Sequence, residues 1–113
     1  MRYSLSSIEM AICSVGSVSL KQLRERKKTV YLNSFRGLFC LFALNSGIHP
    51  TIVGGRLART RGNVINQAKR YSGYLDSRDK FISRLYEAIN NKLNKINEQR
   101  RHASDSRPVI PVR

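Results

Sequence analysis

Apolar residues recur every three or four positions along most of the chain, and this spacing limits the fold more than any other feature. Near the start, Ile8, Ile12 and Val15 follow it. Later segments repeat it, as helices that bury one face do. No segment alternates apolar and polar residues over the length that a half-buried strand needs. The sequence therefore predicts an all-α fold, a compact helical domain with a long C-terminal helix.

Residues 30–44 are expected to form the central helix, because their apolar face is broad enough to be touched from several sides. Gly47 follows this helix and suits a left-handed cap. Before it, a short helix begins at Ser19, and residues 24–28 are too charged to be buried and predict a loop. The broad apolar face consists of Leu32, Phe35, Leu38, Phe39, Cys40, Leu41, Phe42 and Ala43.

Capping signals predict where the first and last helices begin. Ser6, with Glu9 three residues later, has the spacing of a capping box. Asp76, supported by Asp79, is expected to cap a final helix that runs to Arg101. Residues 102–113 predict a disordered basic tail, so residues 1–101 form a single domain, as suits a chain of 113 residues. The final helix has an apolar stripe of Phe81, Leu85, Ile89, Leu93 and Ile96.

Positive charge is concentrated in the middle of the sequence. The formal net charge is +14, and residues 21–75 carry eleven Lys and Arg against one acid, Glu25. Since 41% of the residues are apolar, this segment should fold and present a basic face rather than form a solvated tail. Such a face indicates a polyanionic partner, nucleic acid first and an acidic membrane second. A basic face that only confers solubility is the alternative.

Several classes of protein are excluded or disfavoured by the sequence. The longest apolar run, residues 38–44, has seven residues, far fewer than the roughly 20 that a membrane span needs. Cys13 and Cys40 have no His at metal-ligand spacing and are expected as buried thiols in a reducing cytoplasm, with a disulfide between them as the alternative. His49 and His102 suggest no nucleophile–base pair, so we expect neither an enzyme nor a cofactor or metal site.

Residues 50–73 have the pattern of a helix-turn-helix. Pro50 suits a first helical turn, residues 58–60 form a short connection, and Thr60 is expected to cap a second helix from Arg61 to about Gly73. Ile52, Val53 and Leu57 are expected to form the inner face of the first helix. Val64, Ile65, Ala68 and Tyr71 are expected to do so in the second.

The outer face of that second helix carries amides and a cation. Asn63, Asn66, Gln67 and Arg70 share it, and Arg59 and Arg61 flank the helix start. Asn and Gln can pair with adenine, and Arg with guanine, in a major groove that accepts one helix. An ordinary polar surface would also favour these residue types. The pattern indicates a recognition helix for double-stranded DNA.

Residues 18 to about 90 resemble the C-terminal DNA-binding domain of the bacterial chromosomal replication initiator DnaA. The basic run at 26–28 matches the basic loop of that family, and Arg36 fits the Arg of its long helix. Ile52 fits its signature Ile, with Arg59 seven and Val64 twelve residues on. Lys69 and Arg70 take the place of its basic pair. The family's Asp-His-Thr-Thr stretch is replaced by residues 60–63, so the same DNA box is not implied.

The resemblance implies a role for each matching residue. Arg26, Lys27 and Lys28 would approach the minor groove or phosphates. Arg59 would contact a base or phosphate, and Lys69 and Arg70 would hold phosphates. The chain lacks the phosphate-binding loop of an ATPase, so DNA binding without ATP hydrolysis is expected, in replication or transcription control near the nucleoid of a bacterial or phage-infected cell. The predicted DNA-binding residues are Arg26, Lys27, Lys28, Arg36, Arg59, Thr60, Arg61, Asn63, Asn66, Gln67, Lys69 and Arg70.

Two other functions remain open from the sequence. Tyr71 and Tyr74 flank the basic helix and could stack on unpaired bases of RNA. Tyr71, however, belongs to the inner face of that helix, where a tyrosine is more often a core residue. A structural protein that packs near nucleic acid without specificity is the other alternative. The long final helix is also a candidate for homodimerisation, although such a stripe more often packs on the domain's own core.

Overall fold

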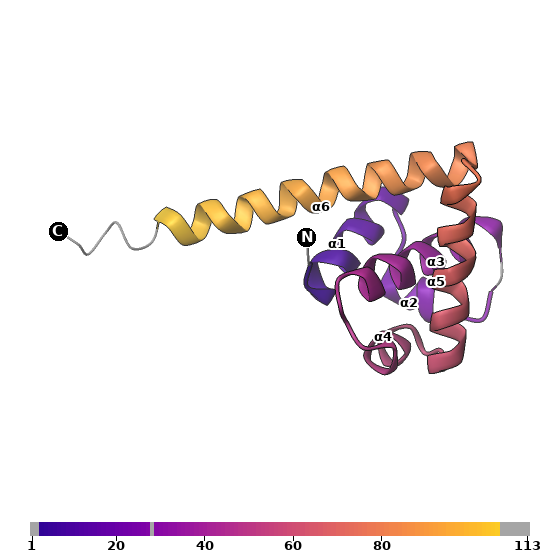
Figure 1. Ribbon diagram of the computed structural model, residues 1–113. Coiled ribbons are helices and arrows are strands. Elements are labelled where there is room, and N and C mark those ends of the chain that lie inside the picture. Colours follow the sequence, from indigo (N-terminus) through magenta and orange to yellow (C-terminus); the bar gives the residue numbers. More distant parts are fainter. Residues whose placement is uncertain (1–2, 28, 107–113) are drawn as a thin grey trace.

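Six α-helices and no strand make up the described part of the chain, residues 3–27 and 29–106, with side chains described up to residue 99. The computed structural model places five of them in a globule and extends the sixth beyond it (Figure 1). The all-α prediction is confirmed. The helices are α1 (Leu5–Gly16), α2 (Leu20–Arg24), α3 (Val30–Asn45), α4 (Pro50–Leu57), α5 (Arg61–Asp76) and α6 (Lys80–Ser106).

Helix α3 is the centre of the fold, as its broad apolar face predicts. Phe35, Leu38 and Phe39 are fully buried, and α1, α2, α4 and α5 all pack on this helix. The tightest approach is at Gly37, where a Cβ atom would overlap the ring of Tyr71 on α5. Glycine therefore allows α5 to lie against α3, and Tyr71 is a core residue.

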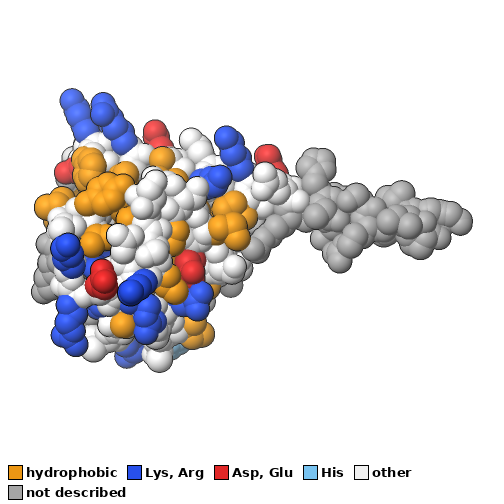
Figure 2. All heavy atoms as spheres, turned by 180° about the vertical axis from the view of Figure 1, so that it is seen from behind, with side chains coloured by type: hydrophobic (Ala, Val, Ile, Leu, Met, Phe, Trp, Pro, Cys, Tyr) orange, Lys and Arg blue, Asp and Glu red, His pale blue; other side chains and the backbone are white. Residues whose placement is uncertain are grey.

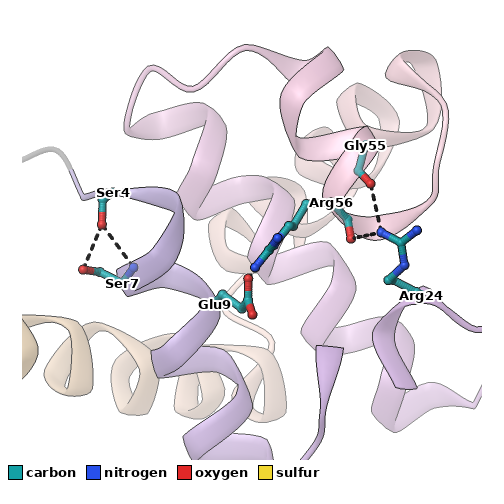
Figure 3. A network of polar contacts seen from close by, with 6 residues as sticks. All are labelled: Ser4, Ser7, Glu9, Arg24, Gly55 and Arg56. Carbon is teal, nitrogen blue, oxygen red and sulfur yellow. Dashed lines mark hydrogen bonds and ion pairs between the residues drawn. The ribbon is translucent and has the colours of Figure 1, made fainter. Parts of the chain in front are cut away.

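The N-terminal cap differs from the prediction. Ser4, and not Ser6, caps α1, because the hydroxyl oxygen of Ser4 accepts from the amide of Ser7 at 3.1 Å. Ser6 lies inside the helix. The carboxylate of Glu9 is engaged elsewhere, in an ion pair with Arg56 of α4 at 2.6 Å (Figure 3).

The start of α6 also differs from the prediction. Asp76 is the last residue of α5, and Asp79 takes the capping position instead, accepting from the amide of Ile82 at 3.0 Å. The buried stripe accordingly includes Ile82, whereas Phe81 is 48% exposed. The tail predicted from residue 102 begins inside a helix that continues to Ser106, and residues 107–113 lie outside the described part.

Helix α6 packs mainly on α1 and then projects past the globule (Figure 1). Ile89, Leu93 and Ile96 are buried in the same core as the residues of α3. The domain itself therefore covers these three residues of the predicted stripe, whereas Leu85 is half-buried and Phe81 is exposed.

Two further observations concern membrane-spanning helices and the cysteines. Among the described residues, no helix combines the length and apolar character needed to cross a membrane. Cys13 and Cys40 are free thiols, the first half-buried and the second buried. Burial raises the pKa of the Cys40 thiol to about 12, so it is neutral at physiological pH.

Candidate nucleic-acid interface

Helices α4 and α5 are joined by the three residues that the sequence assigned to the connection. Ala58 adopts a left-handed conformation with φ of 55°, which turns the chain sharply. Gly54 permits this turn, since a Cβ atom there would lie 2.5 Å from the carbonyl oxygen of Arg59. Thr60 then caps α5 by accepting from the amide of Asn63 at 3.1 Å. The predicted starts of both helices, Pro50 and Arg61, are confirmed.

The buried face of this unit matches the prediction with two corrections. Val53, Leu57, Val64 and Ala68 are buried. Ile52, which was expected inside, is 56% exposed, and the buried face of α4 consists of Val53, Gly54 and Leu57. Ile65 is only half-buried; it lies over the end of α3, beside Leu41 and Leu44.

The outer face of α5 is exposed and carries no acid before its final residue, Asp76. Gln67 is half-buried, at the edge of this face. The face combines amide side chains, which can donate and accept, with cations, and so suits base edges and phosphates. The exposed members of the predicted set on this helix are Arg61, Asn63, Asn66, Lys69 and Arg70.

The basic loop lies beside the start of α5. Arg26 lines one surface hollow, of about 310 Å³, together with Arg59, Thr60 and Asn63. Lys27 is exposed in the same loop, and Lys28 lies outside the described residues. Two segments more than thirty residues apart in sequence thus contribute to one basic surface. Figure 2 shows from behind that Lys and Arg side chains are also spread over the globule and the base of α6.

Arginines fix the loop to the α4–α5 connection. The Arg24 guanidinium donates to the carbonyl oxygens of Gly55 and Arg56 at 3.0 and 2.8 Å (Figure 3). The Arg59 guanidinium donates in return to the carbonyl oxygens of Arg24 and Glu25 at 3.2 and 2.6 Å. The last carbonyls of a helix lack partners within it and carry partial negative charge, so cations are favourable there. Arg59 is therefore bound internally in addition to lining the surface.

Arg36 does not lie on the surface, which corrects its assignment to the DNA-binding set. Its side chain is 4% exposed, and it donates to the carbonyl oxygens of Leu23 at 2.7 Å and Glu25 at 2.8 Å. It also donates to the Oδ1 atom of Asn33 at 2.9 Å. Burial, followed by the positive charge of Arg59, lowers the pKa of its guanidinium. Arg36 positions the α2–α3 loop from inside.

Sequence reasoning missed Arg24 and Asn33. Arg24 was assigned only to a charged loop, and Asn33 to no site at all. The partners of Arg24 lie on α4, about thirty residues away, and no local spacing in the sequence indicates such a contact. Asn33 instead accepts from Arg36, three residues later on the same helix, a spacing that makes two residues neighbours on a helix.

No protein-family model matches the chain, and no curated protein matches it. The resemblance to the DnaA domain therefore stays a prediction from sequence spacing.

Proposed function

We propose that the protein binds double-stranded DNA, with α5 as the recognition helix and residues 26–27 as a second contact. The observation that carries this proposal is the exposed, acid-free face of α5 next to the basic loop. A major groove about 12 Å wide accepts one helix. The flanking cations would then meet phosphates.

The exposed residues of the proposed interface would have two roles, base reading and phosphate binding. Arg61, Asn63 and Asn66 are exposed near the start of α5 and would read base edges, with Gln67 at the edge of this group. Lys69, an exposed cation further along α5, would hold phosphates, as would Arg26 and Lys27 in the loop. These contacts would be salt-dependent, because each releases counterions from DNA.

Arg59 has a different proposed role from the one that the resemblance implies. Its guanidinium already donates to carbonyl oxygens of Arg24 and Glu25, so we assign it to holding the loop against the connection. Thr60 likewise acts as the cap of α5. Both residues would support the interface more than they read bases.

The DnaA-like spacing supports the same proposal and suggests a regulator of replication or transcription, acting on the nucleoid in the cytoplasm. Since residues 60–63 depart from the family's reading stretch, the DNA sequence recognised would differ from the initiator's own. The sequence contains no phosphate-binding ATPase motif, so the proposal includes DNA binding without ATP hydrolysis through that motif.

Selection of sites from a random duplex library tests this proposal directly. We expect enrichment of a defined site, with preference for duplex over single-stranded DNA and structured RNA at two salt concentrations. A sequence-dependent part of the affinity should survive at the higher salt. Preference for structured RNA, or binding without any selected site, would contradict the proposal and favour one of the two alternatives.

The RNA alternative has less support because its two tyrosines are not equivalent. Tyr71 is buried against Gly37, and its ring meets that of Tyr74 edge-on at 5.1 Å. Only Tyr74, 39% exposed, is free to stack on an unpaired base.

A further inference from the structure

A second hollow lies between α3 and α5, next to the one that Arg26 lines. Its volume is about 140 Å³, well above the roughly 30 Å³ that one water molecule occupies in the liquid. Arg59 and Asn63 line both hollows, so this pocket opens beside the start of α5. Its polar lining consists of Arg36, Arg59, Arg70, Asn33, Asn63 and Gln67.

The pocket is rich in hydrogen-bond donors. The side-chain oxygen of Asn33 accepts from Arg36, which leaves the amide nitrogen of Asn33 to donate. Among the described residues, no hydrogen bond engages the side chains of Asn63, Gln67 or Arg70. Donors from two helices can therefore converge on one ligand.

The electrostatics of the pocket favour an anion. Three guanidinium groups line it and none of the described lining residues is acidic. Cys40, which also lines it, stays a neutral thiol because burial raises its pKa to about 12. The positive charge of Arg59 contributes to lowering the pKa of Arg36, so an anion between the two would relieve an existing repulsion.

We propose that this pocket, lined by Arg36, Arg59, Arg70, Asn33, Asn63 and Gln67, binds a phosphate group. Guanidinium and amide donors arranged around several oxygens match phosphate chemistry. The phosphate could belong to the backbone of a DNA strand or to a free phosphate-bearing molecule. The first source rests on the proposed function, and the second is independent of it.

Titration with inorganic phosphate, followed by NMR of side-chain amides in the intact protein, tests the pocket without DNA. We expect the amide signals of Asn33, Asn63 and Gln67 to shift with phosphate far more than with chloride at equal ionic strength. The variant Gln67→Glu places a carboxylate in the pocket and should weaken phosphate binding about tenfold. Its matched control is Gln99→Glu on the exposed face of α6, which should bind phosphate as the parent protein does.

Binding to random-sequence duplex tests the DNA source, because base reading contributes little there. Gln67→Glu should lose about tenfold more affinity than Asn66→Asp. Asn66 neighbours it on α5 but does not line the pocket. It therefore reports the general cost of a new carboxylate near DNA.

A second pair of variants tests whether a weaker affinity of Gln67→Glu comes only from a local effect of that substitution on the fold. Arg70→Gln removes a pocket cation that makes no hydrogen bond in the described residues. Arg84→Gln removes an exposed cation of α6. Only Arg70→Gln should weaken binding of phosphate and of random duplex.

The outcomes separate the two proposals. If phosphate shifts the amide signals but the protein does not bind duplex DNA, the pocket proposal is supported and the proposed function is wrong. If the protein binds duplex DNA, phosphate shifts no amide signal, and Gln67→Glu and Asn66→Asp lose equal affinity for random duplex, the proposed function is supported and the pocket proposal is wrong. A larger duplex loss for Gln67→Glu, even without shifts from free phosphate, would support a backbone phosphate as the ligand.

Discussion

Arg24 and Arg59 each donate hydrogen bonds to backbone carbonyls near the other residue, Arg24 at the end of α4 and Arg59 at the end of α2. Arg24, the last residue of α2, donates to the carbonyl oxygens of Gly55 and Arg56 in the last turn of α4. Arg59, two residues beyond α4, donates to the carbonyl oxygen of Arg24 at 3.2 Å. The two exchanges fix α2 and the loop after it to the α4–α5 connection, so the basic loop has a defined place beside α5.

Replacing Arg59 by alanine should therefore act through structure. The carbonyl oxygen of Arg24 would lose this donor and that of Glu25 would keep only Arg36, at an expected cost of about 1–2 kcal/mol in the free energy of unfolding. Urea denaturation measures this cost. Affinity for all duplexes should fall together while the preferred site stays the same.

Arg61→Ala is the matched control for this variant, since Arg61 is an exposed arginine two residues away. It should leave the unfolding free energy within about 0.5 kcal/mol of the parent protein. An Arg59→Ala protein of parental stability with a changed site preference would assign base reading to Arg59 instead.

The buried guanidinium of Arg36 should matter more for stability. Arg36→Met keeps much of the side-chain volume but leaves the carbonyl oxygens of Leu23 and Glu25 without this donor. We expect a loss of about 3 kcal/mol in unfolding free energy, measured by urea denaturation. Arg84→Met, on the exposed face of α6, should cost little, and equal losses for the two would contradict an internal role for Arg36.

Local signals in the sequence were enough to place most of the helices. Pro50 and Thr60 mark the starts of α4 and α5 through their own backbone and side-chain chemistry, and such signals need no knowledge of distant residues. The same rules failed where two candidates competed. Asp76 and Asp79 are both good caps, and the burial of Ile82 in place of Phe81 selects the second.

The candidate site was less predictable than the fold. Helical periodicity places Asn63 and Asn66 on one exposed face because neighbours on a helix follow from spacing alone. Arg36 and Arg59 could not be assigned in this way. Their partners are backbone carbonyls at the end of α2. Because every residue type has a backbone carbonyl, the sequence does not indicate which residues accept these hydrogen bonds.

The two adjacent glycines of α4 should respond to alanine in opposite ways. A Cβ atom on Gly54 would lie 2.5 Å from the backbone oxygen of Arg59, whereas one on Gly55 meets nothing within 4 Å. Gly55→Ala should stabilise the protein by about 0.5–1 kcal/mol through helix propensity. Gly54→Ala should destabilise it by forcing the connection apart, and thermal unfolding of both variants measures the contrast. Equal effects of the two substitutions would show that the connection can shift to accept a side chain.

The two thiols should differ in reactivity. Only the thiolate is nucleophilic, and burial raises the pKa of both groups, with the charge of Glu9 adding to the effect at Cys13. Cys13 is half-buried and Cys40 buried, so alkylation at mildly alkaline pH should label Cys13 slowly. Cys40 should react only after unfolding. Mass spectrometry of the labelled protein checks the order, and early labelling of Cys40 in folded protein would contradict the packing of α3.

Residues that read bases and residues that bind phosphates in the proposed interface should affect DNA affinity differently across a series of salt concentrations. Asn66→Ala removes an exposed amide from the outer face of α5 and should cost about 1–3 kcal/mol on the selected site while leaving random duplex almost unaffected. Lys27→Ala removes an exposed loop cation and should weaken all duplexes alike, lowering the slope of log affinity against log salt by about 1. If Asn66→Ala and Lys27→Ala instead have the same effect on both kinds of duplex, α5 does not read sequence and the protein packs on DNA through charge alone.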